Sequence, residues 1–130
     1  MTATRTTGTI LLAHGSRDPQ WRLPFESILK KMQAQSAAPR ALAFLESMTP
    51  TFAQTIDEMV AAGAKQISVV PVFLAVGSHV RKDLPNLLEA ARQRHPGLTL
   101  EASAAIGEQD VIQDAIAQFA LQASTLAGLK

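Results

Sequence analysis

The 130-residue chain contains no cysteine, and this absence removes several classes of site at once. Disulfide bridges, thiolate-bound zinc and iron–sulfur clusters all need cysteine sulfur, so none of them can form here. A chain without cysteine is also typical of the reducing cytoplasm, and we expect a cytoplasmic protein.

An excess of charge of either sign is missing as well. The 12 Lys and Arg side chains are balanced by 11 Asp and Glu, which leaves a formal net charge of +1. A general nucleic-acid or anionic-membrane surface needs surplus cationic side chains to hold phosphates. We therefore expect neither nucleic acid nor a membrane among the partners.

Long apolar runs, internal repeats and low-complexity linkers are absent from the sequence. The apolar run near the N-terminus is too short for a signal peptide, and no segment is long enough to span a bilayer. The apolar content of 47% is ordinary for a soluble globular protein. We expect a single domain over residues 1–130.

What the chain does contain is a regular alternation of strand and helix patterns. Short apolar, partly β-branched runs predict buried strands, and apolar residues at helical spacing predict amphipathic helices. The expected strands lie at 9–13, 41–46, 66–74 and 98–104, and the expected helices lie within 21–35, 49–64, 80–95 and 108–125. The first helix is expected to bury one stripe, formed by Phe25, Ile28, Leu29 and Met32.

Single residues sharpen some of these boundaries. Thr49 is the predicted N-cap of the second helix, and Gly63 is its predicted stop. Pro71 cannot donate to a strand ladder, so we place it near the last paired residue of the third strand. Trp21 could belong either to the core or to a pocket wall.

Strands that alternate with helices predict an α/β domain. It should have a four-stranded parallel sheet, helices on both faces and right-handed crossovers. In such sheets ligands bind at the carboxyl ends of the strands. The loops that follow Ala13, Leu45, Leu74 and Ala104 are therefore the candidate functional loops.

Two histidines and a carboxylate lie on three of these loops. His14 follows the first strand, Glu46 the second, and His79 the third. Neutral imidazole is a good ligand for Co²⁺, Ni²⁺, Fe²⁺ and Zn²⁺, and the spacing is not that of a closed structural zinc site. Two or three protein ligands would leave open positions on a metal ion, which suits a protein that hands the ion on. The same groups could also accept protons.

Each of these residues has a structural interpretation too. Either histidine could form only a loop hydrogen bond, and Glu46 could cap the next helix or pair with Arg17. We interpret Asp18 and Asp83 as carboxylates at helix starts, where the helix dipole favours them. His95 is interpreted as a structural residue at a helix end.

Other active-site patterns fit these loops poorly. The HGSRDP turn, residues 14–19, lacks the lysine of a phosphate-binding loop. Ser16 is preceded by His-Gly and followed by Arg, so it does not form the G-x-S-x-G elbow of a serine hydrolase. A response-regulator domain needs acidic groups at the ends of the first and third strands, where this chain has histidines.

Three stretches together resemble one known family. HGSRDP after the first strand, FLE at the end of the second, and VVPVFLAVGSHVRKDLP around the third resemble the CbiX/SirB group of class II chelatases. Members insert a divalent metal, typically cobalt, into sirohydrochlorin. The resemblance extends to the order of elements along nearly the whole chain, and implies a three-layer chelatase-like (flavodoxin-like) domain. The length is similar to that of the short, single-unit members, which implies a homodimer.

By this resemblance His14 and His79 would be the metal-binding and catalytic pair, with Glu46 as the accompanying carboxylate. The metal would be the substrate, Co²⁺ first and Ni²⁺ or Fe²⁺ as alternatives, with no organic cofactor. Sirohydrochlorin is flat and polyanionic, so its face needs apolar contacts and its arms need cations and N–H donors. Charge and position nominate the substrate-binding residues: Ser16, Arg17, Phe73, Leu74, Ser78, Arg81 and Lys82.

Two other functions stay open at this point. The same cleft could serve a non-catalytic carrier of metal or tetrapyrrole, which would bind without accelerating metal insertion. A purely structural or regulatory α/β domain would tolerate replacement of both histidines without functional effect.

Overall fold

The centre of the molecule is a parallel sheet of four strands in the order β2-β1-β3-β4. The computed structural model describes residues 7–128, apart from the side chains of 124 and 126–128. The register pairs Ile10 of β1 with Ala41 on one side and with Val69 on the other. The predicted sheet is confirmed, with these bounds: β1 (Thr7–Ala13), β2 (Arg40–Phe44), β3 (Gln66–Pro71) and β4 (Thr99–Ala102).

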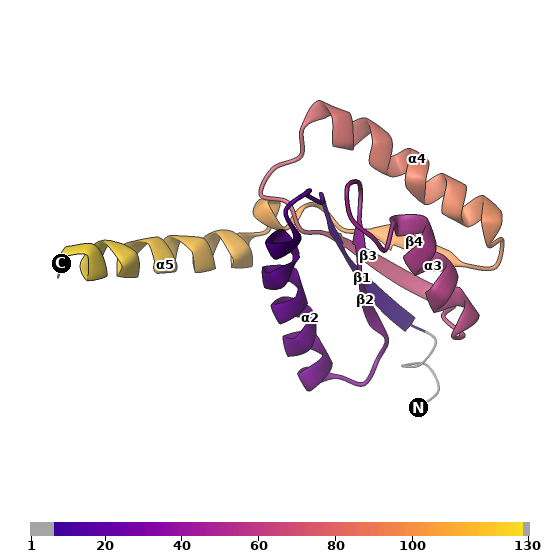
Figure 1. The fold of residues 1–130 in the computed structure, drawn as a ribbon, viewed down its shortest axis with the longest axis horizontal. Coiled ribbons are helices and arrows are strands. Elements are labelled where there is room, and N and C mark those ends of the chain that lie inside the picture. The colour runs from indigo at the N-terminus through magenta and orange to yellow at the C-terminus, as the bar shows by residue number, and fades with distance from the viewer. Residues whose placement is uncertain (1–6, 129–130) are drawn as a thin grey trace.

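Helices connect the strands and cover both faces of the sheet, so the predicted α/β class is confirmed as well (Figure 1). One face carries α2, and the opposite face carries α3 and α4. Two short 3-10 turns precede α2 and α5. The helical bounds are η1 (Pro19–Arg22), α2 (Leu23–Gln35), α3 (Phe52–Ala61), α4 (Ser78–Arg94), η2 (Ile106–Glu108) and α5 (Asp110–Gly128).

Strand β1 contributes to two separate apolar cores because successive side chains point to opposite faces. Ile10 and Leu12 enter the core under α3 and α4, while Leu11 and Ala13 enter the core under α2. A fully buried Ile or Leu stabilises the fold by roughly 1.5–3 kcal/mol. Burial on both faces explains why β1 is almost continuously apolar.

Helix α3 begins two residues later than the sequence predicts. Thr51 is its N-cap: the Oγ1 of Thr51 accepts from the backbone N–H of Gln54 at 3.2 Å, and the Gln54 Oε1 accepts from the backbone N–H of Thr51 at 2.8 Å. This reciprocal capping box needs Gln or Glu three residues after the cap. The prediction of Thr49 as N-cap is wrong because Phe52 occupies that third position.

Two further local predictions are confirmed. Gly63 follows the end of α3 with a φ of 107°, a left-handed conformation that favours glycine. Pro71 pairs with Leu12 at the last position of the β1–β3 ladder, where its missing N–H costs no interior hydrogen bond.

Helix α2 packs on the sheet less deeply than predicted. Phe25, Leu29 and Met32 are partly buried against the core, but Ile28 is 40% exposed, so its predicted burial is wrong. Ile28 lies at the margin of the stripe, beyond the reach of the sheet. Trp21 packs on the same core, with its ring centroid 4.6 Å from that of Phe25.

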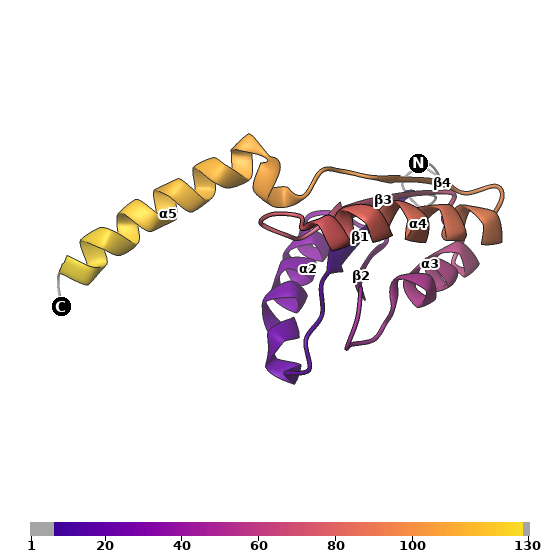
Figure 2. The same ribbon diagram turned by 90° about the horizontal axis from the view of Figure 1, so that it is seen from above.

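Helix α5 forms as predicted but joins neither layer. It extends away from the layered body of the domain, and its main contacts are with η2 (Figure 2). Among residues 7–128, no helix combines the length and the apolar character that crossing a bilayer requires.

The tightest polar link between α3 and α4 lies at the edge of the sheet opposite the histidine loops. The Asp57 Oδ1 accepts from the Nη2 of Arg94 at 2.8 Å and contacts the Nε2 of His95 at 2.7 Å. These hydrogen bonds, from Arg94 first and then His95, hold the pKa of Asp57 below its ordinary value of 3.8. The structural interpretation of His95, which caps the C-terminus of α4, fits this contact.

Gly15 allows the loops after β1 and β2 to touch. Its φ is 103°, and a Cβ at this position would lie 1.8 Å from the backbone oxygen of Glu46. Only glycine fits both the conformation and the space. Gly77, which precedes α4 at the same edge of the sheet, differs in this respect, because a Cβ there would have no other atom within 4 Å.

Replacing Asp57 by Asn should lower the free energy of unfolding at neutral pH by less than about 1 kcal/mol, because the pair is largely solvent-exposed. A carboxyl whose pKa is lowered on folding stabilises the fold above its unfolded pKa and loses that contribution as the pH falls. The difference between native and Asp57→Asn chains should therefore be present above about pH 4 and vanish in stronger acid. Urea unfolding at several pH values measures this. An undiminished difference at about pH 2, well below the unfolded pKa, would contradict the assignment.

Replacing Gly15 by Ala should destabilise the fold by roughly 2 kcal/mol or more, because the left-handed conformation and the clash with backbone both oppose a methyl group. Gly77→Ala is the matched control: Gly77 is the N-cap of α4, where glycine is preferred to alanine, so the free energy of unfolding should fall by less than about 1 kcal/mol. Chemical denaturation of both variants tests this, and equal midpoints would show that the two loops are not in this close contact.

Candidate metal centre

His14 and Glu46 meet at the carboxyl ends of the two neighbouring strands β1 and β2. The His14 Nε2 and the Glu46 Oε2 are 2.9 Å apart. Backbone hydrogen bonds align the two loops, since the N–H of Leu45 donates to the Ala13 oxygen and that of Glu46 donates to the His14 oxygen, both at 3.0 Å. The two side chains are 47% and 62% exposed, so an ion from solvent can reach both. Glu46 thus pairs with His14, and neither caps α3 nor pairs with Arg17.

The ring of His14 also rests against an aromatic neighbour. Its centroid lies 6.3 Å from that of Phe73, and the two planes are at 71°, an edge-to-face arrangement. Phe73 follows β3 and packs on the larger core. This contact limits the orientations of the imidazole and helps to keep Nε2 directed at Glu46.

His79 lies in the first turn of α4 and has a different carboxylate partner. Its Nε2 is 3.0 Å from the Oδ2 of Asp83, one helical turn further along. The side chain of His79 is 84% exposed. The interpretation of Asp83 as a helix-start carboxylate is wrong, because α4 begins at Ser78 and the Asp83 side chain pairs with an imidazole instead.

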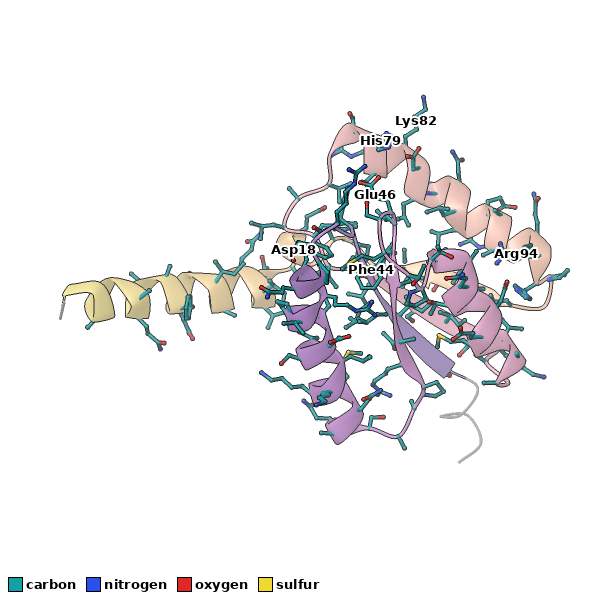
Figure 3. All side chains as sticks on the ribbon, viewed as in Figure 1. Asp18, Phe44, Glu46, His79, Lys82 and Arg94 are labelled. Atoms are coloured by element: carbon teal, nitrogen blue, oxygen red, sulfur yellow. The ribbon has the colours of Figure 1, made fainter. Side chains whose placement is uncertain are left out.

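One cavity of about 350 Å³ joins these two pairs. Figure 3 shows Glu46 and His79 on the same side of the molecule, one on the loop after β2 and the other at the start of α4. The cavity wall combines polar and apolar side chains; it is formed by His14, Leu45, Glu46, His79, Val80, Asp83, Leu84, Asn86 and Leu87.

The predicted meeting of all three ligand candidates is only partly seen. His14 and Glu46 are in contact, whereas His79 lies elsewhere on the wall of the same cavity. Among the described residues, no group of three or more His, Asp or Glu side chains is arranged so that it could hold a metal ion together. The structure therefore offers a two-residue ligand set with a second imidazole nearby.

The charge of the cavity wall favours a cation. Two carboxylates, those of Glu46 and Asp83, face the cavity, and of the described residues that line it none is Lys or Arg. Carboxylate and imidazole together are suitable ligands for borderline divalent metals. The apolar side chains on the same wall, such as Leu84 and Leu87, could support an apolar ligand surface.

The predicted substrate-binding residues are spread over several surfaces. Ser16 and Arg17 line a neighbouring polar cavity of about 530 Å³, beside Arg22, Ser47 and Thr49. The Ser16 Oγ accepts from the backbone N–H of Asp18 at 3.1 Å, which orders the turn. Asp18 itself accepts from the N–H of Gln20 and caps η1, in agreement with its predicted structural role.

The cations of α4 do not line the cavity that contains the histidines. The Arg81 Nη2 donates to the Val76 oxygen at 3.0 Å, and the residue lines another cavity of about 290 Å³ beside β4. Lys82 extends away from the body of the domain (Figure 3). Leu74 and Ser78 are exposed on the loop and at the first residue of α4.

Asp83, Asn86 and Leu87 line the cavity although the strand-end rule does not nominate them. That rule selects loop residues, whereas these side chains lie inside α4. A signal for them is nevertheless present in the sequence. From His79, steps of three and four residues along a helix reach Asp83 and then Asn86 and Leu87, all on one face.

Comparison with known proteins agrees with this geometry. A model of the CbiX family matches residues 8–123. The sirohydrochlorin cobaltochelatase of Methanococcus aeolicus is 38% identical over 80 residues, which cover 61% of this chain and 56% of that protein. The sirohydrochlorin cobaltochelatase of Saccharolobus solfataricus is 34% identical over 84 residues, which cover 62% of each. In both cases the match spans less than two thirds of the relative's own length.

Solved structures extend the similarity to the whole fold. A CbiX protein from Marinobacter aquaeolei VT8 superposes with a TM-score of 0.83 at 31% identity, covering 92% of this chain and 98% of that one. The sirohydrochlorin chelatase SirB from Bacillus subtilis subspecies spizizenii, in complex with cobalt, gives a TM-score of 0.72 at 27% identity, covering 81% of this chain and 45% of SirB. The family model matches most of the chain, residues 8–123, and the chain therefore belongs to the CbiX family.

Proposed function

We propose that this chain is a metal chelatase that inserts a divalent ion, Co²⁺ in first place, into sirohydrochlorin during tetrapyrrole and cobalamin biosynthesis. The observation that carries the proposal is the pair of His14 and Glu46, 2.9 Å apart, on a cavity that His79 also lines. The names of the relatives, sirohydrochlorin cobaltochelatases, support the same reaction.

The contact between His14 and Glu46 links metal entry to proton movement. When the imidazole nitrogen donates its proton to Glu46, it has no lone pair available for a metal ion. An arriving Co²⁺ would replace that proton and take ligands from both side chains, so binding of the ion releases a proton. The reverse exchange would let His14 accept a pyrrole proton as the ion leaves for the macrocycle.

Weak protein ligation suits this reaction. A closed set of four ligands would hold the ion against the tetrapyrrole, whereas two ligands leave most of the coordination sphere to water and substrate. His79 lies across the same cavity and could provide the second base for the two pyrrole protons that must leave. Asp83, 3.0 Å from His79, orients that imidazole.

The macrocycle would lie over the mouth of the cavity rather than inside it. A volume of about 350 Å³ is at the lower end of ligand sites. The leucines of the wall provide apolar contact for the flat ring. The carboxylate arms are repelled by Glu46 and Asp83, so we place at least one of them in the neighbouring polar cavity, where Arg17 offers a cation.

The ligand side chains of the site do not by themselves select one metal ion. Imidazole and carboxylate bind Co²⁺, Ni²⁺ and Fe²⁺ in a graded series without rejecting any of them. Co²⁺ is preferred here because of the named activity of the relatives. We infer that Ni²⁺ or Fe²⁺ can be inserted by the same groups, and that no organic cofactor takes part.

The chain is further proposed to work in the cytoplasm as a homodimer. Its lack of cysteine fits a reducing compartment. It covers 45% of the SirB chain, so two copies would match the length of that larger chelatase.

A carrier of metal or tetrapyrrole is the second candidate. One observation favours it. Among the described residues of the strand-end loops that line the cavity, only two side chains able to bind a metal ion, those of His14 and Glu46, are in contact. Such a pair is enough to bind an ion without catalysing its insertion.

Replacing His14 by Ala should reduce the rate of Co²⁺ insertion into sirohydrochlorin by at least about 100-fold, because one residue serves as ligand and as base. The absorbance change of the macrocycle on metallation measures this. His95→Gln is the matched control, since His95 is also paired with a carboxylate but lies at the opposite edge of the sheet. Its rate should equal that of the native chain. A His14→Ala rate within twofold of the native rate would contradict the proposal.

Turnover separates the enzyme from the carrier. With sirohydrochlorin and Co²⁺ in roughly 50-fold excess over protein, a chelatase should convert the macrocycle well beyond one equivalent per chain and faster than the protein-free reaction. The same spectrum followed to completion gives the number of turnovers. Conversion that stops at one equivalent would favour the carrier.

A further inference from the structure

Asn86 is a polar residue of the cavity that contains the histidines, and no step of the proposed reaction uses it. It lines this cavity of about 350 Å³ together with the pairs His14–Glu46 and His79–Asp83. The Asn86 side chain is exposed, and it has no hydrogen-bond partner within the part of the chain that the structure describes. Its amide is therefore available to a ligand.

Helix α4 places Asn86 on the same side as the second imidazole. Asn86 lies three residues after Asp83 and seven after His79, and residues at these intervals share one face of an α-helix. Seven residues correspond to about 10 Å along the helix axis. The α4 wall of the cavity thus has an imidazole–carboxylate pair at one end and a free amide at the other.

Asn86 supplies a kind of donor that the rest of the described lining lacks. An asparagine amide has two N–H donors and one carbonyl acceptor, and carries no net charge. The imidazoles of His14 and His79 already have their Nε2 atoms paired with carboxylates. Apart from those two rings, the amide of Asn86 is the only side-chain N–H group among the described residues that line the cavity.

An uncharged donor suits a cavity that must serve two ligands of opposite charge. The carboxylates of Glu46 and Asp83 attract a divalent cation and repel the carboxylate arms of a polyanionic macrocycle. A lysine or arginine at position 86 would bind an arm but repel the ion, and another carboxylate there would do the reverse. A neutral amide can donate to a carboxylate without changing the charge that the ion meets.

The position of Asn86 on α4 complements that of Arg17. Arg17 lines the neighbouring polar cavity from the loop after β1, and so serves the other side of a macrocycle that lies over the cavity mouth. The cations of α4 are directed elsewhere: Arg81 donates to the Val76 oxygen, and Lys82 extends away from the body of the domain (Figure 3). An arm on the α4 side therefore has Asn86 as its available donor.

We propose that Asn86 binds a carboxylate arm of sirohydrochlorin on the α4 side of the cavity, and that its neutrality lets the same cavity admit the divalent ion. The Nδ2–H groups of Asn86 donate to the carboxylate of the bound arm. The assignment rests on sirohydrochlorin as the proposed substrate and adds a specificity-determining residue to its site. A macrocycle without a carboxylate on that side loses this hydrogen bond.

The experiment measures the binding of each ligand separately, so that no metal insertion takes place. Trp21 is the single tryptophan of the chain, and quenching of its fluorescence by metal-free sirohydrochlorin gives the dissociation constant of the macrocycle. Isothermal titration calorimetry with Co²⁺ alone gives the dissociation constant of the ion. Both are measured on the 130-residue chain and its variants, and circular dichroism checks that each variant is folded.

Two substitutions of Asn86 separate the loss of the donor from the addition of charge. Asn86→Leu removes the donor alone, and should raise the dissociation constant of the macrocycle about tenfold while that of Co²⁺ stays within about threefold. Asn86→Asp also adds a negative charge at nearly the same size. It should raise the dissociation constant of the macrocycle at least about 30-fold, and that of Co²⁺ should fall or stay the same.

Gln93→Glu is the matched control. It makes the same amide-to-carboxylate change on the same helix, seven residues further along, at an exposed side chain outside the cavity lining. Both dissociation constants should stay within about threefold of the native values, because solvent and salt screen a charge at that distance.

Three results would overturn the assignment of Asn86. The first is an Asn86→Leu chain that binds the macrocycle as tightly as the native chain, since the amide then forms no bond to it. The second is an effect of Asn86→Asp no larger than that of Gln93→Glu. The third is weaker binding of both ligands by Asn86→Asp, which would show a general disturbance of the cavity.

Failure of the proposed reaction has a different signature. A native chain that binds sirohydrochlorin without accelerating metal insertion contradicts the chelatase, and the two Asn86 variants still decide how the macrocycle is bound. A native chain that does not bind sirohydrochlorin overturns both proposals.

Discussion

The close approach of two parallel strand ends is the constraint from which the rest of the site follows. Strands β1 and β2 stay paired to their last residues, and the backbone ladder continues one step further into both loops. Gly15 permits this because any side chain there would collide with the backbone of Glu46. A histidine and a carboxylate that are 32 residues apart in sequence are thereby brought within hydrogen-bond distance.

The structure places anionic and cationic side chains in two different cavities, as a metal ion and a polyanionic ring would require. The cavity with the histidines has carboxylates on its wall, and of its described lining residues none is cationic. The neighbouring cavity has Arg17 and Arg22. A cation and carboxylate arms prefer opposite surroundings, so under the proposed function the two cavities would accommodate both without burying an unpaired charge.

The two faces of the sheet are covered unequally. Two helices close the face above Val69 and Leu100, and a single described helix covers part of the other. A parallel sheet is normally covered on both faces. Among the described residues, α5 contacts mainly η2 and so does not complete the cover of that face.

Much of the fold could be predicted from the sequence, because local physical rules determine it. Burial on both faces makes β1 a continuous apolar run, and Pro71 can only be tolerated where the ladder ends. The error at Thr49 arose because threonine alone does not make a cap; the residue three positions later decides, and Gln54 selects Thr51.

The sequence by itself determined the strand–helix order, the loops after β1 and β2 that carry His14 and Glu46, the connection after β3 that leads to His79, and the family motifs. Only the tertiary structure decided which of these side chains touch. The backbone ladder between β1 and β2 brings His14 into contact with Glu46. The helical spacing inside α4 pairs His79 with Asp83. The tertiary structure also determines that α5 extends away from the domain. The residue pattern of a helix indicates that the helix has an apolar side, but it does not indicate which surface covers that side.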